Sequence, residues 1–203
     1  MTGFGRLFAR AMLCGALGAL PAACGHMPVT SMVKLAGVDF AATDPAGLRA
    51  AVKLPGAIRP LREQVRLRLT VRLANGKEDT QDFRLNEVSD PADIASLRDE
   101  IEAGTHLFAY RLEPAEATRL AAFRDALQKQ QTASGGRGGA LTISTAPEVC
   151  RGGELAGGPV LFTTYLRTAE TGGYVPLARD VDMRSIARGR DIAAQMPECG
   201  PSR

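Results

Sequence analysis

Asp180 and Asp182 form a pair of carboxylates with a spacing that could support chemistry. They stand two residues apart, so on a strand they would share one face. Paired carboxylates can exchange protons with a substrate or hold a cation. Arg179 and Arg184 flank them, and opposite charges at this spacing favour a surface cluster of ion pairs over an acid–base pair.

His106 is the candidate general base of the body of the chain. It would need a nucleophile and an orienting carboxylate close in space, and no Gly-x-Ser-x-Gly motif marks a nucleophile. A structural or exposed histidine is therefore the favoured interpretation. The alternative is a hydrolase-type site with dispersed residues, in which His106 works with Asp180 or Asp182.

Metal, cofactor and phosphate sites have no support in the residue spacing. The two histidines are His26 and His106, and the chain has no CxxC or HxxxH motif, so neither a metal nor a cofactor is expected. The glycine-rich stretch Gly135–Gly139 follows an expected helix and precedes a strand. A phosphate-binding loop has the opposite order, strand then helix, which makes this stretch a linker.

A hairpin is the clearest structural element that the sequence predicts. Val65–Leu73 alternates apolar and polar residues without a break, as a half-buried strand does, and Asn75-Gly76 marks a turn. A three-residue loop with Gly76 in the left-handed conformation places Phe83 opposite Leu67 and Leu85 opposite Val65. It also pairs Arg68 with Asp82 and Arg72 with Glu78, and it predicts a Leu73–Lys77 pair.

Two helices are predicted from their ends. Asp90 can cap a helix with Pro91 at its first position, an apolar stripe through Ile101 and a stop at Gly104. A second helix runs from Pro114 to about Gln131 and buries three side chains: Leu120, Phe123 and Leu127. A third helical stretch covers roughly 183–194.

The other expected elements are strands, and together they define the fold class. They cover 31–40, 48–54, 106–112, 140–145, 160–168 and 174–181. Short hairpin-like connections favour antiparallel pairing. The prediction is a mainly β fold with inserted helices: an antiparallel β-sandwich of about eight short strands plus two or three helices. The alternative is an open α+β antiparallel sheet with helices on one face.

The N-terminus has the organisation of an export signal. Residues 1–10 hold Arg6 and Arg10 and no acidic residue, and residues 11–23 are apolar and uncharged. This run is too short to cross a bilayer, which takes about 20 residues. We therefore expect a signal peptide at 1–23, a tether at 24–30 and a single globular domain at 31–203.

The end of this signal resembles the lipobox of bacterial lipoprotein precursors. The sequence Leu20-Pro21-Ala22-Ala23-Cys24-Gly25 places small residues before a cysteine. In that family the thiol receives a diacylglycerol and the chain is cut just before it. The resemblance implies lipidation of Cys24 and a membrane anchor facing the periplasm. Gly25 is not the aspartate that retains some lipoproteins at the inner membrane, which slightly favours the outer membrane.

The cysteine count fits this interpretation. Cys14 would leave with the signal peptide, and three cysteines remain, an odd number for an oxidising compartment. With lipid on Cys24, Cys150 and Cys199 are left and can form a disulfide. The alternatives are two free buried thiols, or a soluble periplasmic protein without a lipid.

The charge balance argues against nucleic acid as a partner. Without Arg6 and Arg10, 23 of the 25 basic residues remain against 22 acidic ones, and the two kinds are interleaved. The leading hypothesis is a non-enzymatic envelope lipoprotein that serves as an accessory or binding subunit of a membrane-associated complex. A periplasmic hydrolase and a small-ligand carrier are the rival hypotheses.

Overall fold

A computed structural model of the chain describes residues 27–40, 42–73, 76–133 and 140–200. The expected signal peptide, Cys24, His26 and the Gly135–Gly139 linker lie outside these residues. Among the described residues, no helix is both long enough and apolar enough to span a bilayer.

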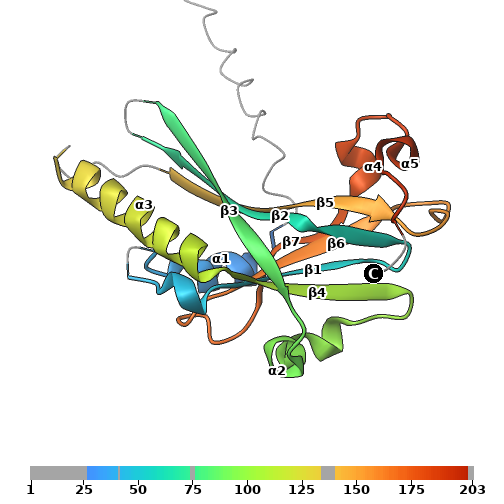
Figure 1. Cartoon of the computed structure of the whole chain (residues 1–203), viewed down its shortest axis with the longest axis horizontal. Helices are drawn as coiled ribbons and strands as arrows, with labels where there is room; N and C mark the ends of the chain where they lie inside the picture. The colour runs from blue at the N-terminus through green and yellow to red at the C-terminus, as the bar shows by residue number, and fades with distance from the viewer. Residues whose placement is uncertain (1–26, 41, 74–75, 134–139, 201–203) are drawn as a thin grey trace, which may run out of the picture.

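Seven antiparallel strands form one sheet in the described residues, in the order β5-β2-β3-β4-β1-β6-β7 (Figure 1). The strands are β1 (Arg49–Pro55), β2 (Ile58–Arg72), β3 (Glu78–Val88), β4 (Thr105–Leu112), β5 (Ala140–Arg151), β6 (Leu161–Arg167) and β7 (Val175–Asp182). The expected mainly β, antiparallel fold with inserted helices is confirmed.

Strand β3 joins the two halves of this sheet. Its first part pairs with β2, and its last residues, Leu85–Val88, pair with β4. The sheet curls at this junction, so β5-β2-β3 crosses over β4-β1-β6-β7 (Figure 1). Side chains of both halves meet in one core that includes Val52, Leu67, Phe83 and Tyr110. The two layers that a sandwich requires are thus formed by the two halves of a single sheet.

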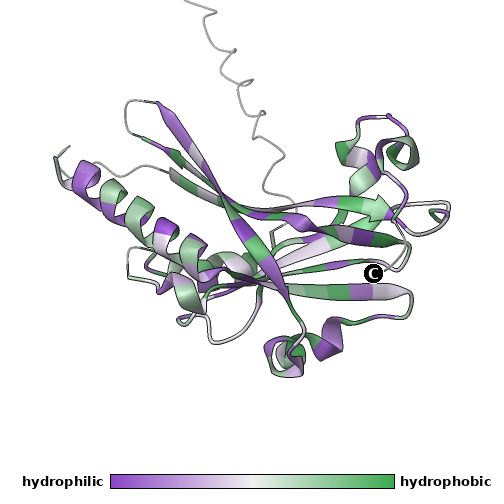
Figure 2. Cartoon of the chain, in the orientation of Figure 1, coloured by the Kyte–Doolittle hydropathy of each residue, from purple (hydrophilic) through white to green (hydrophobic). Residues whose placement is uncertain are grey.

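The predicted hairpin register is confirmed. Leu67 lies opposite Phe83, and the backbone N–H of Leu73 donates to the carbonyl of Lys77 over 2.8 Å. Gly76 has a φ of 81°, the left-handed conformation that the loop requires. In β2 buried and more exposed residues alternate from Val65 to Arg72, whereas β3 begins with hydrophilic residues and alternates only from Asp82 onwards (Figure 2).

The helices are α1 (Val29–Ala36), α2 (Pro91–Ile94), α3 (Pro114–Ala133), α4 (Met183–Ile186) and α5 (Ile192–Gln195), with 3₁₀ turns η2 (Pro45–Gly47) and η3 (Ala95–Glu100). The helix α3 starts at the predicted residue and lies across the inner face of the hairpin half. Leu120 is buried, and Phe123 packs against the same core.

Three expected elements need correction. The strand expected at 31–40 is the helix α1, because Ser31 and Leu35, four residues apart, are the side chains that turn towards the domain. The helix capped by Asp90 changes to a 3₁₀ turn after Ile94, and Ile101 is 47% exposed.

The third correction concerns the stretch 183–194, which is two short helices rather than one. Arg188 and Gly189 adopt positive φ angles of 51° and 80°, which break the helical path. Asp191 then caps α5 by accepting a hydrogen bond from the N–H of Ala193.

Candidate functional site

The candidate hydrolase residues are not brought together. His106 is exposed near the start of β4, opposite Leu54 of β1. Asp180 and Asp182 lie on β7, three strands away in the sheet, which is about 14 Å at the usual strand spacing. The imidazole of His106 lies edge-on to the ring of Phe108, with the ring centroids 6.4 Å apart. His106 is therefore not placed beside Asp180 or Asp182, as the hydrolase alternative requires.

Both aspartates have structural partners. The side chain of Asp180 accepts a hydrogen bond from the hydroxyl of Thr163 over 3.2 Å. Asp182 accepts hydrogen bonds from two backbone N–H groups, those of Arg184 and Val160, each over 3.0 Å, and so caps α4. These hydrogen bonds all use the Oδ1 atom of each aspartate, and they give both side chains a structural role.

The ion pairs expected between these aspartates and their neighbouring arginines do not form. Arg179 points instead to Glu100, and Arg184 donates to the backbone carbonyls of Gly158 and Ala156. The expectation was wrong for two reasons. Arg179 and Asp180 are neighbours on a strand and face different sides, and Arg184 lies in α4, where its side chain reaches the loop at 156–158.

The densest polar cluster lies where residues 90–104, here called the strap, cross the outer face of β4, β1, β6 and β7. The strap contains α2 and η3. Three acidic residues of the strap, Asp93, Glu100 and Glu102, pair with cations of the sheet. Beneath them Leu97 is buried in a small cluster with Ala51, Ala109 and Tyr165.

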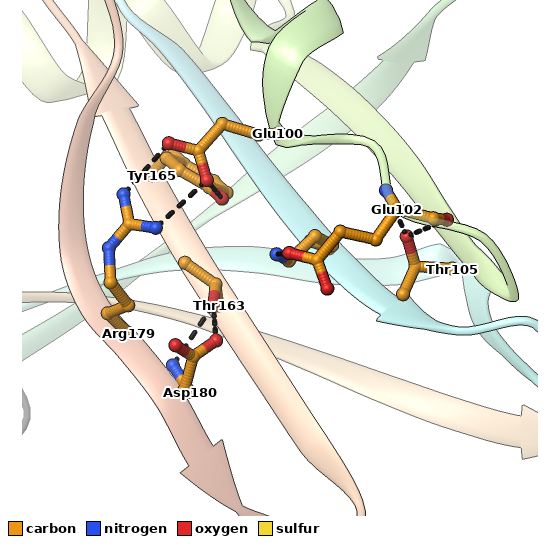
Figure 3. A network of polar contacts seen from close by, with 8 residues as sticks. Glu100, Glu102, Thr105, Thr163, Tyr165, Arg179 and Asp180 are labelled. Carbon is orange, nitrogen blue, oxygen red and sulfur yellow. Dashed lines mark hydrogen bonds and ion pairs between the residues drawn. The ribbon is translucent and has the colours of Figure 1, made fainter.

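Glu100 is the centre of this cluster (Figure 3). Its two carboxylate oxygens accept hydrogen bonds from Arg179 over 2.8 and 2.9 Å, and the Tyr165 hydroxyl donates over 2.9 Å. The hydrogen bond from Arg179 is the main cause that lowers the pKa of Glu100. Burial, with the nearby carboxylate, raises the pKa of Tyr165, so the phenol stays a donor.

Three further ion pairs hold the ends of the strap. Lys53, with a side chain only 7% exposed, donates to Glu102 over 2.7 Å. Asp93 receives both Arg49 at 3.3 Å and Arg167 at 2.9 Å. The guanidinium of Arg167 also lies over the Tyr174 ring, 5.2 Å from its centroid.

The ion pairs of this cluster attach the strap to the outer face of the sheet. Asp93, Glu100 and Glu102 are each bound to a cation of the sheet. Among the described residues, no three His, Cys, Asp or Glu side chains are grouped as a metal site would need. Sequence reasoning missed the cluster because Glu100 and Arg179 are 79 residues apart.

Replacing Glu102 with glutamine should lower the free energy of unfolding by about 1–3 kcal/mol, because it leaves the buried ammonium of Lys53 without its counter-charge. Replacing Lys53 with methionine should change stability by less than about 1 kcal/mol, since an apolar chain of similar size removes the buried charge and Glu102 is exposed to water. Urea denaturation of both variants measures the difference. Equal losses would contradict this account of the pair.

The Glu100 pair predicts a loss of stability in acid. Because its folded pKa lies below the ordinary 4.5, its contribution is complete above that value and disappears as pH falls through the folded pKa. Glu100→Gln should therefore be less stable than wild type at pH 7, and the gap should narrow as the pH falls below 4.5 and through the folded pKa. Denaturation from pH 7 to pH 3 tests this, and a gap independent of pH would refute it.

The outer edge of β5 is one of the two edges of the sheet, and β7 forms the other. Strand β5 ends the sheet, and over residues 141–145 its described backbone pairs only with β2. The stretch from Ala140 to Pro147 has no charged residue, although charged side chains usually protect such edges. At Arg151 the C-terminal segment caps the edge through a parallel bridge to Glu198, next to the Cys150–Cys199 disulfide.

The cavities of the described residues are small or open. The apolar one lies between α3 and the hairpin half, lined by Phe40, Leu69 and Phe123 among others, and has a volume of about 100 Å³. Pockets that enclose a small organic ligand are usually about 300–1,000 Å³. A larger groove of about 380 Å³ lies between the end of β5 and the helices α4 and α5.

Comparisons with protein-family models, with curated proteins and with solved structures find no significant match for the chain.

Proposed function

We propose that the chain is an exported envelope lipoprotein, held on a membrane by lipid on Cys24, whose domain is a non-enzymatic binding or accessory subunit. The membrane surface faces the periplasm, and the outer membrane is favoured over the inner one. The proposal rests on the N-terminal sequence and on the chemistry of the folded body.

The disulfide is the observation that carries this proposal. Cys150 and Cys199 are joined, with a sequence separation of 49 residues. Structural disulfides are typical of proteins folded outside the reducing cytosol. With Cys14 in the signal peptide, this pairing leaves Cys24 as the single cysteine without a partner, as a lipid-bearing residue must be.

The binding role is supported by what the body offers. Glu100 is engaged in an ion pair and Asp182 in a helix cap, and the apolar cavity between α3 and the hairpin half, about 100 Å³, is smaller than a usual ligand pocket. The uncharged edge of β5 can accept an extended strand of a partner through backbone hydrogen bonds. We propose this edge as the surface through which the domain binds another envelope protein.

The test is cross-linking and co-purification from detergent-extracted membranes of the native host. A partner captured with wild type and lost with Cys24→Ser would support an anchored accessory subunit. Ser144→Lys should also lose the partner while keeping the melting temperature, because Ser144 is exposed on β5. Thr118→Lys, exposed on α3, is the matched control. A protein that purifies alone in every case contradicts the proposal.

A further inference from the structure

Helix α1 exposes an apolar stripe at the start of the described chain. Val29 and Val33 are each 71% exposed, and Met32 is 44% exposed. These residues are spaced three and four apart, so they lie along one side of the helix. The opposite side is attached to the domain, since Ser31 is buried and Leu35 packs against the core.

The stripe lies close to Cys24 along the chain. Four residues separate Cys24 from Val29, and a fully extended chain of that length spans about 17 Å. If Cys24 carries the lipid, α1 therefore begins within this distance of the bilayer surface. The helix itself is about 12 Å long, so its whole length stays near the headgroup region.

The charge of this segment suits a membrane surface. From Gly25 to Val38 the chain has no acidic residue, and Lys34 is exposed on the flank of the helix, about 100° around its axis from Val33. Bilayer surfaces that contain anionic lipids attract basic groups and repel carboxylates. A helix with an apolar side and a basic residue can lie flat in the interface, with the apolar side among the acyl chains.

From this placement we infer that α1 is a second membrane contact, with its Val29, Met32 and Val33 side inserted into the bilayer surface next to the lipid of Cys24. This inference rests on the proposed function. Two attachment points fix the rotation of the domain on the membrane, which a flexible tether alone cannot do. Because α1 also lies against β7, the orientation of the helix sets the orientation of the sheet.

A fluorescent probe at Val33 tests this inference on the full lipidated protein. In Val33→Cys the new thiol is the only free one after processing, because Cys24 is acylated and the other two cysteines are joined. The labelled protein is reconstituted into vesicles of phosphatidylcholine and phosphatidylglycerol. We expect blue-shifted emission, resistance to aqueous iodide and strong quenching by spin-labelled lipid. Asp99→Cys, exposed on the strap, is the control and should remain accessible to iodide.

Each other outcome overturns the inference in a recognisable way. A Val33 probe as accessible to iodide as the Asp99 control shows that α1 stays in water. A probe shielded from iodide but not quenched by lipid shows that a protein surface covers the stripe. Serine at Val29 and Met32 should return the probe to water, and no change would contradict insertion. A mature chain whose Cys24 fragment has no lipid mass overturns the proposed function and this inference together.

Discussion

Replacing both Cys150 and Cys199 with serine is expected to lower the free energy of unfolding by about 4 kcal/mol. The disulfide closes a loop with a sequence separation of 49, and the chain-entropy relation gives this magnitude for such a loop. For a protein of ordinary stability, about 5–15 kcal/mol, this is a large share of the total. Guanidinium denaturation of the double variant and of wild type measures the loss.

The same bond has a local role that a second measurement separates. The segment after α5 is held at the end of β5 by two backbone hydrogen bonds, from Arg151 to Pro197 and from Cys199 to Arg151, each over 2.9 Å. Without the disulfide, amide exchange should rise first in residues 192–199. Wild type treated with a reductant should match the double variant. A loss below about 1 kcal/mol would contradict the chain-entropy account.

Phe83→Ala is expected to destabilise the protein by about 3–5 kcal/mol, the usual cost of removing a buried aromatic side chain. The ring is 0% exposed, lies 6.2 Å from the ring of Phe123, and has the guanidinium of Arg119 at 4.2 Å from its centroid. It therefore joins β3 to α3, and the variant should also increase amide exchange in α3.

Phe83→Leu is the matched control for this variant. Leucine keeps most of the apolar volume but loses the ring, so the expected loss is smaller, about 1–2 kcal/mol. Thermal and urea denaturation of the two variants give the comparison. If both variants lose the same free energy, the cavity at Phe83 is not the cause.

The hairpin could be predicted because the residues that determine its register lie close together in the sequence. The alternation in β2 identifies its buried face. A shift of one residue in the register between β2 and β3 would turn Phe83 to the solvent-exposed face. Gly76 then selects the loop that avoids this shift. The ends of α3 were also readable, because Pro114 can start a helix without losing a needed N–H.

The strap and α1 could not be predicted for the opposite reason. The partners of Glu100 and Asp93 come from distant strands, so their positions depend on the curl of the whole sheet. Nothing in the local sequence distinguishes Glu100 from an exposed acidic residue at the end of a helix. In α1, the apolar residues fit either a strand or a helix, and the contact with β7 decides the outcome.

The most direct test of the central claim is the mass of the mature N-terminal fragment, isolated from membranes of the native host. The account predicts a chain that begins at Cys24 and has the added mass of a diacylglycerol, which disappears in Cys24→Ser. A mature chain that begins at another residue, with an unmodified thiol at Cys24, would contradict the lipoprotein assignment.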